Sequence, residues 1–458
     1  MKLRSSWRPR LATGNKHVYE RLVETLVDDI ERGRVAEGDR LPAQREVAHA
    51  LGIAVGTVTK AFTILERRGL VVSSHGSGTF VGTLPGRRTA MIDLSMNVPP
   101  AAISDRLLRA TLAGLSRRID AATFGAYQPP AGRADHRAAL ARWLSRDRLK
   151  IEPETLIMAN GAQHALSIAF AVTARPGATI FTEQETYPGA ITLARGAGYR
   201  LQGVAMDAEG MDPGSLERAL RDVRKRGPRP IVYMTPTLHN PTARTMSEGR
   251  RRAIVRLCRQ HDAYVVEDDV YGALAEHQPT PLLALAPERT LHVSGLSKAL
   301  SPGLRIGALI APRSEMERVM MALTASSTMA SPLTAAVMET WLVDGTASST
   351  VQTIRKEAAA RTTLAAKMLE IPPPGVPGFH VWLPAPQAHA VALQSAALEG
   401  GIALTPPSAT VTDPHAAASG LRICLGGPQQ DELRMALAHL RDLFRSGARS
   451  TASGLARI

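Results

Sequence analysis

The chain has 458 residues, more than a single hydrophobic core usually organises, so two or three domains are expected. Its hydrophobic content of 44% and charged content of 21% are typical of a globular protein in water, and no apolar run is long enough to span a membrane. The two cysteines, Cys258 and Cys424, lie far apart without clustered histidines, which argues against a disulfide framework or a structural zinc site. Because no apolar leader stands at the start, we expect a cytoplasmic protein.

The net charge of +14 suits a polyanionic partner such as nucleic acid. A general richness in arginine would give the same value. The charge alone therefore does not decide between the two explanations.

Residues 14–83 are expected to form one compact, helix-rich domain. Apolar residues recur every four positions over 18–30, which predicts a first helix with one apolar stripe. Helices over 44–51 and 56–68 follow, with a glycine after each as a stop. Next, two short apolar runs flank a glycine-rich tip within 70–81 and predict a hairpin, or wing. This order is typical of a winged helix-turn-helix.

The third of these helices has a polar face near its start. Thr57, Thr59 and Lys60 project away from the apolar side of the helix. A recognition helix needs short hydrogen-bonding side chains there for base edges and cations for phosphates. An ordinary solvated helix face has the same composition, so the pattern by itself leaves both interpretations open.

A resemblance to a known family favours DNA binding. The runs Asp-Arg-Leu-Pro-Ala-Gln-Arg-Glu-Val-Ala at 39–48, Leu-Gly-Ile-Ala-Val-Gly-Thr-Val-Thr at 51–59 and Gly-Ser-Gly-Thr-Phe-Val at 76–81 resemble the winged helix of GntR regulators. The resemblance implies that double-stranded operator DNA is contacted by Arg45, Gly56, Thr57, Thr59, His75 and Gly76. Other members carry arginines where this chain has Val55 and Thr59, so the operator sequence is not implied.

Residues 84–92 contain proline, glycine and paired arginines and are expected to be a linker. Beyond them, short apolar runs such as 155–160, 230–235 and 263–267 alternate with helix-length segments. That alternation predicts a largely parallel α/β sheet. Leucines at helical spacing over 433–440 predict a smaller terminal domain.

The run Val-Ser-Gly-Leu-Ser-Lys-Ala-Leu-Ser-Pro-Gly-Leu-Arg at 293–305 carries the most chemical information. An apolar approach leads to a turn of small residues with Lys298, and Arg305 follows seven residues later. A lysine amine can condense with an aldehyde, and burial beside cations makes it nucleophilic. An arginine within reach can hold a phosphate by charge-assisted hydrogen bonds. The run therefore indicates pyridoxal phosphate.

Three further runs follow predicted strands. Residues 160–163, Asn-Gly-Ala-Gln, open an apolar helix whose first N–H groups could bind an anion, although a simple helix cap would look the same. Asp268 stands at a strand's carboxyl end, where a carboxylate can keep a pyridine nitrogen protonated. A divalent-metal pair is the alternative there, but further ligands are not spaced nearby, so no metal is expected. Asn240 could donate to a ring oxygen or form a turn.

Residues 93–445 as a whole resemble a fold-type-I aminotransferase of class I/II, with a mostly parallel α/β large domain and a smaller α+β terminal domain. The resemblance implies that Lys298 forms the internal aldimine with pyridoxal 5′-phosphate and that Asp268 pairs with the pyridine nitrogen. It implies further cofactor contacts: the phosphate with Gly161, Ala162, Gln163, Ser297 and Arg305, the ring face with Tyr187, and the phenolic oxygen with Asn240 and Tyr271.

Two more positions follow from the same resemblance. Tyr127 matches a tyrosine that reaches the phosphate of the neighbouring subunit, which implies a homodimer. Arg422 matches the arginine that clamps the α-carboxylate of an amino acid. Two residues depart from the family pattern: Ala243 replaces a usual glycine, and Gly295 replaces a frequent phosphate-binding serine. Neither removes a group that the covalent bond at Lys298 requires.

A GntR-like winged helix joined to an aminotransferase-like domain resembles the MocR subfamily of bacterial regulators. The resemblance implies a regulator that senses an amino compound, or pyridoxal phosphate itself, and thereby changes operator binding. The alternative is a working aminotransferase that carries a DNA-binding head, because Lys298, Asp268 and Arg422 are all present. A purely architectural DNA binder leaves the cofactor residues unexplained. The effector, the target genes and the direction of regulation are not implied by these residues.

Overall fold

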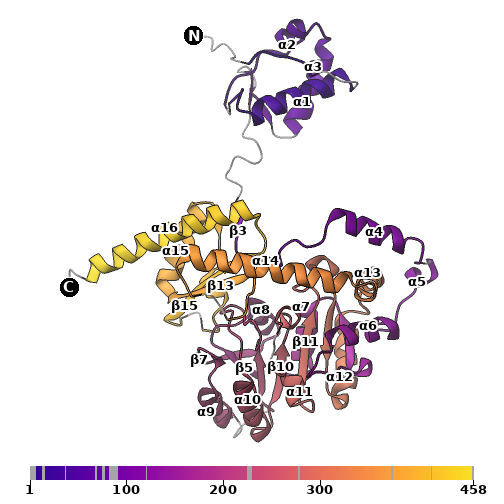
Figure 1. Ribbon diagram of the computed structural model, residues 1–458, viewed down its shortest axis with the longest axis vertical. Helices are drawn as coiled ribbons and strands as arrows, with labels where there is room; N and C mark the ends of the chain where they lie inside the picture. The colour runs from indigo at the N-terminus through magenta and orange to yellow at the C-terminus, as the bar shows by residue number, and fades with distance from the viewer. Residues whose placement is uncertain are drawn as a thin grey trace. The chain divides into compact units, whose positions relative to one another are not determined.

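The structure is a computed structural model that describes residues 7–12, 16–36, 38–67, 70–74, 78–81, 91–119, 121–223, 229–276, 279–372, 375–413 and 415–455. The chain divides into two compact units, Met1–Met91 and Ile92–Ile458. Both are drawn in Figure 1, and each is described here by itself.

In the described residues of the first unit there are three helices and a two-stranded antiparallel hairpin. Its elements are α1 (Val18–Glu31), α2 (Gln44–Leu51), α3 (Val55–Arg67), β1 (Val71–Ser74) and β2 (Gly78–Val81). Helix α2 ends at Gly52, whose φ of +64° is the left-handed conformation that glycine adopts without strain. The elements predicted from the sequence are confirmed within a residue or two at their ends.

The core of the first unit forms where the apolar faces of the helices meet. Leu22 and Leu26 of α1 and Leu65 of α3 are fully buried, and Phe62 is 2% exposed. These side chains pack with Val47 of α2 in one cluster. The apolar stripe predicted for α1 is therefore the face that holds the three helices together.

The second unit is built on a seven-stranded sheet with the order β4-β12-β11-β10-β9-β5-β6. Strand β12 runs antiparallel to both of its neighbours, and the other pairs are parallel. The predicted, mostly parallel sheet is confirmed. The strands are β4 (Leu156–Ala159), β5 (Thr179–Glu183), β6 (Arg200–Val204), β9 (Ile231–Met234), β10 (Tyr264–Asp268), β11 (Thr290–Gly295) and β12 (Gly307–Ile310).

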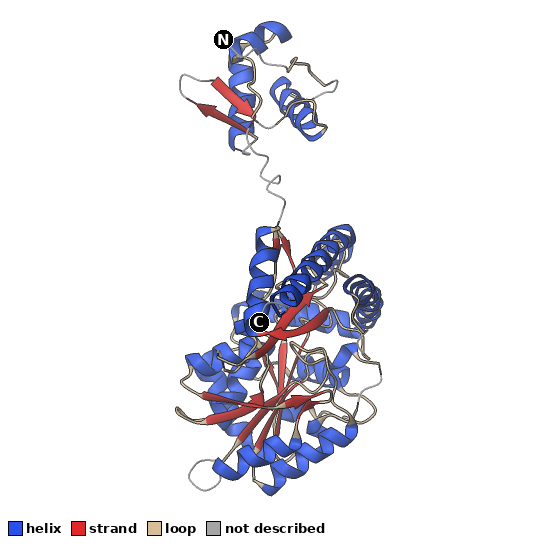
Figure 2. Ribbon diagram, turned by 90° about the vertical axis from the view of Figure 1, so that its left-hand side faces the viewer, coloured by secondary structure: helices blue, strands red, loops and turns tan. Residues whose placement is uncertain are grey.

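Helices cover both faces of this sheet, as Figure 2 shows. Helices α7 (Ala162–Thr173), α8 (Pro188–Gly196) and α12 (Met316–Ser326) pack on one face. The opposite face carries α6 (Ala134–Leu144), α9 (Pro213–Val223), α10 (Glu248–Gln260), α11 (Leu282–Leu285) and α13 (Pro332–Val343).

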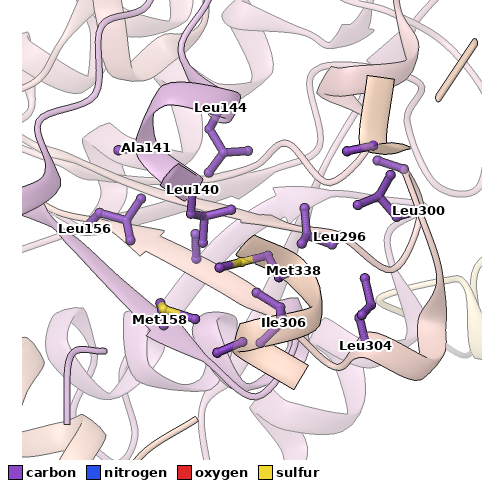
Figure 3. Close-up of a cluster of buried hydrophobic side chains, with 14 of the residues drawn as sticks. Leu140, Ala141, Leu144, Leu156, Met158, Leu296, Leu300, Leu304, Ile306 and Met338 are labelled. Carbon is purple, nitrogen blue, oxygen red and sulfur yellow. The ribbon is translucent and has the colours of Figure 1, made fainter. Parts of the chain in front are cut away.

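Alternate residues of each strand point to opposite faces of the sheet. In β4, Ile157 packs on the α7 side, whereas Leu156 and Met158 pack on the other. Figure 3 shows these two side chains near Leu140 of α6 and Met338 of α13. Because both faces of the sheet are covered, β4 and β9 are buried along their whole length and are continuous apolar runs in the sequence.

A smaller terminal domain follows the long helix α14 (Thr346–Leu369). It contains β13 (His380–Pro386), α15 (Gln387–Glu399), β14 (Ile402–Ala403), β15 (Ala418–Cys424) and α16 (Gln430–Leu455). The short strand β3 (Ile92–Asp93), at the start of this unit, pairs with β14. Leu433, Leu437 and Leu440 of α16 are fully buried in this domain, as their helical spacing predicted.

The remaining elements are short connections. They are α4 (Asp105–Leu115), α5 (Ala121–Gly125), the hairpin of β7 (Met206–Asp207) with β8 (Gly210–Met211), and the 3₁₀ turns Pro153–Thr155, Gly272–Leu274, Pro302–Leu304, Arg313–Glu315 and Pro407–Ala409. Within the described ranges, none of the helices combines the length and the apolar content needed to cross a membrane.

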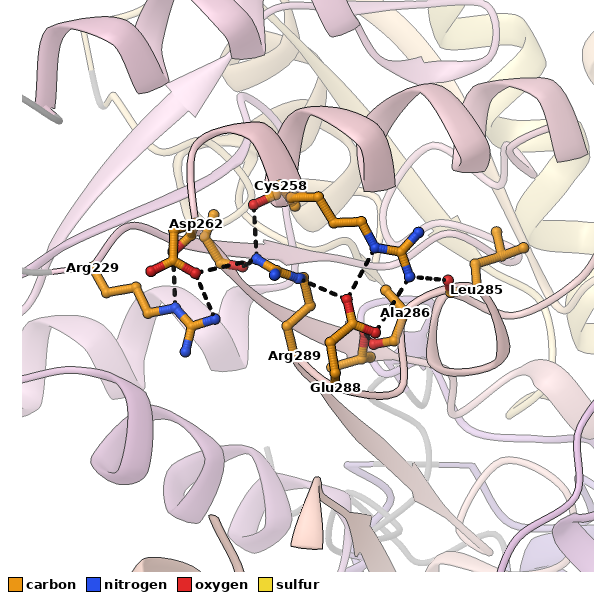
Figure 4. A network of polar contacts seen from close by, with 10 residues as sticks. Arg229, Cys258, Asp262, Leu285, Ala286, Glu288 and Arg289 are labelled. Carbon is orange, nitrogen blue, oxygen red and sulfur yellow. Dashed lines mark hydrogen bonds and ion pairs between the residues drawn. The ribbon is translucent and has the colours of Figure 1, made fainter. Parts of the chain in front are cut away.

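Ion pairs tie together the chain segments at the amino ends of β10 and β11 (Figure 4). Arg229 and Arg289 both pair with Asp262, and Arg289 also pairs with Glu288 and donates to the carbonyl of Cys258. Exposed pairs of this kind each contribute about 0–1 kcal/mol, so their main effect is to fix the segments relative to one another. These ion pairs hold the segments at the amino ends of β10 and β11. A ligand site is expected at the carboxyl ends of the strands.

Candidate functional site

The carboxyl ends of β4, β9, β10 and β11 surround a cavity of about 110 Å³. Crevices at this edge are where open α/β sheets bind ligands. Most of the cofactor positions expected from the sequence lie around it, although they come from segments far apart in the chain. The lining residues are Ala162, Gln163, Leu166, Tyr187, Thr235, Asn240, Asp268, Val270, Tyr271, Gly295, Ser297, Lys298 and Arg305.

Lys298 lies in the turn after β11. Its Nζ donates a hydrogen bond to the backbone carbonyl of Asn97. Burial, and then the nearby charge of Arg422, lower the pKa of the Lys298 amine to about 8. An ordinary lysine has a pKa near 10.4, so a much larger fraction of this amine is neutral at physiological pH. The neutral form is the nucleophile that attacks an aldehyde.

Asp268 is the last residue of β10. Its carboxylate accepts hydrogen bonds from the hydroxyl of Tyr233 at 3.1 Å and the backbone N–H of Val270 at 3.4 Å. Burial raises the pKa of Asp268 to about 6, so the carboxylate form still predominates at neutral pH. The next residue, Asp269, forms an ion pair with Arg146 and is absent from the cavity lining. Of the two neighbouring aspartates, therefore, only Asp268 lines the cavity, while Asp269 is held by Arg146.

One end of the cavity presents donors suited to an anion. Gly161, with a φ of +86°, is the N-cap of α7, and the first two residues of that helix, Ala162 and Gln163, line the cavity, where helix N–H groups favour an anion. Arg305 donates to the carbonyl of Asn160 at 3.2 Å, and a Cβ atom at Gly161 would lie 2.5 Å from its guanidinium. Only glycine lets the arginine lie against this turn.

Ser297 lines the same cavity, and its buried hydroxyl makes no hydrogen bond with any described part of the chain. A phosphate could accept from the helix start, Arg305 and this hydroxyl together. The donor set therefore fits the phosphate of pyridoxal phosphate.

Tyr187 lies beside Gln163 at the start of α8. A Cβ atom at Gly189 would collide with its ring, so glycine at that position leaves the ring its room. Gln163 donates to the carbonyl of Gly189 at 2.9 Å, which ties α7 to this turn. Burial raises the pKa of the Tyr187 hydroxyl, so the phenol stays neutral.

Asn240 connects the cavity to Arg422. Its amide oxygen accepts from Arg422 at 2.7 Å, so its NH₂ group is left as the donor. Arg422 also donates to the carbonyl of Ser95 at 2.9 Å and the hydroxyl of Thr405 at 2.8 Å. Arg422 is buried behind Asn240 and does not itself line the cavity.

The two departures from the family pattern have physical consequences. Ala243 adopts a φ of +58°, the region where glycine is favoured and where an alanine costs roughly 1–2 kcal/mol. A Cβ atom at Gly295 would lie 3.2 Å from that of Ala162, so a serine there would crowd the start of α7. Ala243 therefore has a strained backbone conformation, and there is little room for a larger side chain at Gly295.

Sequence reasoning missed several polar residues of the site. Asn97 donates from its side chain to the hydroxyl of Tyr271 at 2.7 Å and is 6% exposed. It lies in a loop, Leu-Ser-Met-Asn-Val-Pro-Pro, that has no periodicity or motif. The sequence pattern places Tyr233 in a strand and says nothing of its buried hydroxyl, which donates to Asp268.

Tyr127 is not brought to this cavity. Its side chain is 83% exposed in the single chain and does not line the site.

In the first unit, the residues predicted to contact DNA lie around the start of α3. Arg45, Gly56, Thr59 and Lys60 are exposed, and Thr57 is half-buried. The Thr59 hydroxyl lies 2.8 Å from the amide oxygen of Gln44, and the Lys60 amine lies 3.8 Å above the ring of Tyr19. His75 and Gly76, predicted for the wing tip, lie outside the described residues.

Comparisons with known proteins agree with this arrangement. Residues 18–81 match the family of bacterial regulatory proteins, gntR family, and residues 89–440 match the family aminotransferase class I and II. The HTH-type transcriptional regulator YdeF of Bacillus subtilis (strain 168) is 29% identical over 78% of this chain and 79% of its own. The vitamin B6 salvage pathway transcriptional repressor PtsJ of Salmonella typhimurium is 28% identical over 79% of this chain and 84% of its own.

Among solved structures, an archaeal alanine:glyoxylate aminotransferase has the same fold. Its TM-score is 0.73 at 22% identity, and the match covers 85% of this chain and 95% of that protein. Because the family match extends over most of the sequence, the chain belongs to the aminotransferase class I and II family, joined here to a GntR-family helix-turn-helix domain as in MocR regulators.

Proposed function

We propose that this protein is a transcriptional regulator that holds pyridoxal phosphate at Lys298 and changes its affinity for operator DNA when an amino compound, or pyridoxal phosphate itself, binds. The observation that carries the proposal is a half-buried lysine that lines one cavity together with Asp268, in a chain that also contains a GntR-type domain. The relative named as a vitamin B6 salvage pathway repressor supports a B6-related signal.

Pyridoxal phosphate supplies, when bound, an aldehyde that condenses with primary amines and a ring that withdraws electrons. Lys298 would supply the amine, and Asp268, which lines the same cavity, would hold a proton on the ring nitrogen. The start of α7, Ser297 and Arg305 would hold the phosphate. Tyr187 would cover one ring face and exclude water, while Asn240 and Tyr271 would donate to the ring oxygen.

Replacing Lys298 by alanine should abolish the yellow absorbance band that accompanies cofactor binding, because the amine that forms the covalent bond is lost. The far-ultraviolet circular dichroism of the variant should match the wild type. Lys150→Ala, a change at an exposed lysine, serves as the control and should keep the band. A band of wild-type intensity in Lys298→Ala would contradict the assignment.

A sensor must bind DNA with different affinity in its two ligand states. Gel-shift titrations against its own promoter region measure that difference when they compare the cofactor-free protein, the cofactor-loaded protein, and the cofactor-loaded protein with an added amino acid. We expect a change of at least about fivefold, the lower end of usual coupling. Equal affinity under all these conditions would refute sensing by this protein.

A working aminotransferase is the second candidate, because Lys298, Asp268 and Arg422 all surround or adjoin the cavity. The same amino-acid additions distinguish the two functions when a second keto acid is supplied as the amino acceptor and the solution is assayed for the keto acid formed from the added amino acid. Sustained release of keto acid indicates turnover. A stable spectral change without keto acid indicates sensing.

The first unit is proposed to bind the operator through the exposed residues around α3. Arg45→Ala should weaken operator binding by about 1–3 kcal/mol, the usual value of one specific base or phosphate contact, and leave cofactor uptake unchanged. Arg32, which already pairs with Asp28 at the end of α1, provides the control substitution Arg32→Ala. An undiminished footprint for Arg45→Ala would argue against this docking.

We also propose a homodimer. Tyr127 is 83% exposed, and in the two helices that precede it in the chain Phe124 of α5 and Leu108 and Leu112 of α4 expose 57%, 41% and 43% of their area. Figure 1 shows α4 and α5 at the margin of the second unit. Exposed apolar side chains grouped in this way are typical of interfaces. Sedimentation equilibrium should give twice the chain mass, and a monomer at all concentrations would rule the dimer out.

A further inference from the structure

Asn97 lies on the segment that enters the second unit. Strand β3 at 92–93 pairs with β14, the N–H of Leu94 donates to the carbonyl of Ala403, and the N–H of Cys424 donates to the carbonyl of Leu94, both at 2.9 Å. The segment is therefore bound to the terminal domain by backbone hydrogen bonds. In the covalent chain it is also the first part of this unit after the DNA-binding unit, which ends at Met91.

Asn97 contacts the cavity in two ways. Its backbone carbonyl accepts from the Lys298 ammonium. Its side-chain amide bonds the hydroxyl of Tyr271 at 2.7 Å and Nδ1 of His380 at 3.1 Å. His380 in turn lies 3.2 Å from the carbonyl of His239 through Nε2. Asn97, His380 and Tyr271 are all buried, so this residue is held in one position between the terminal domain and the site.

The contact with Lys298 depends on the chemical state of the amine. A free lysine ammonium has three N–H donors. When it condenses with an aldehyde, two of its hydrogens leave with the aldehyde oxygen as water, and the resulting carbon–nitrogen double bond leaves one N–H on a protonated nitrogen. An incoming primary amine that takes over the bond to the aldehyde carbon returns the lysine as a free amine. The charge-assisted hydrogen bond to Asn97 is therefore present in one state and altered in the other.

We propose that Asn97 is a positioning residue that couples the state of the Lys298 amine to the 92–97 segment, and through that segment to DNA binding. The inference rests on the proposed function, because it presumes that the cofactor state changes operator affinity. Beyond the proposed function, we infer that a change in the Lys298 amine affects DNA binding by way of Asn97. This residue contacts both Lys298 and Tyr271 and lies close in sequence to the DNA-binding unit.

The test uses the full-length, cofactor-loaded protein with Asn97→Ala. The operator affinity is measured with and without an amino compound that changes the absorbance of the wild type. The ratio of the two affinities should fall from the wild-type value, about fivefold or more, to below about twofold in the variant. Met96→Ala is the matched control, because this neighbouring side chain is 61% exposed, and it should keep the wild-type ratio.

The pH dependence of the cofactor absorbance band is a second measurement, which distinguishes a positioning role of Asn97 from a general loss of structure in the variant. Loss of the amide that holds Tyr271 should shift the pH dependence of the cofactor absorbance band in Asn97→Ala, whereas Met96→Ala should leave it unchanged. If Asn97→Ala does not fold, Asn97→Asp keeps the size of the side chain and removes the amide donors. The same two measurements then apply to that variant.

The outcomes are distinguishable. If the wild type itself shows no ligand-dependent change in operator affinity, the proposed function fails, and this inference fails with it. If the wild type responds and the Asn97 variants respond equally, with an unshifted band, the inference alone is overturned. A reduced ratio together with a shifted band supports it.

Discussion

The site depends on the burial of one amine among charges of the same sign. Lys298 lies near Arg305 and Arg422, and the only carboxylate among the lining residues of the cavity is Asp268. Buried charge that is not balanced is costly, and the lowered pKa of the lysine is one response to that cost. An anionic ligand beside Arg305 is the other response, because its charge offsets the excess. The electrostatics of the cavity therefore suit a ligand that carries a phosphate beside Arg305 and an aldehyde beside Lys298.

The residues around the Lys298 amine come from the carboxyl ends of neighbouring strands, which the fold brings together. Asp268 ends β10, Lys298 follows β11, and the turn at Gly161 follows β4. The antiparallel strand β12 lies between β11 and β4, so Arg305, just before it, reaches the same edge. At the other edge, ion pairs around Asp262 and Glu288 hold the segments that lead into the strands. The loops at the amino ends of the strands are thereby fixed by ion pairs, while the loops at the carboxyl ends contain the residues that line the cavity.

Local sequence was sufficient for groups whose chemistry is carried by a short motif. Lys298 with Arg305, and Asp268 at a strand end, could be placed from spacing and residue type, and the winged helix from helical periodicity. Asn97 could not, because its contacts with Lys298 and Tyr271 join segments more than 170 residues apart, and nothing in its own loop marks it. The hydrogen-bond partners of Arg422 could not be predicted from the sequence either, because Asn240 and Ser95 lie far from it along the chain. Tyr127 is different: its predicted role concerns a second chain, which the arrangement of one chain does not test.

The energies involved are compatible with a regulator that works through few contacts. A tenfold change in DNA affinity corresponds to about 1.4 kcal/mol. A hydrogen bond to a charged group contributes about 1.5–3 kcal/mol, so the contact between Lys298 and the Asn97 carbonyl can account for a tenfold change if it is present in one state of the amine and lost in the other. A large rearrangement of the core is then unnecessary. What is needed is a residue that touches the reacting group and is held rigidly on the segment leading to the DNA-binding unit, and buried Asn97 has both properties.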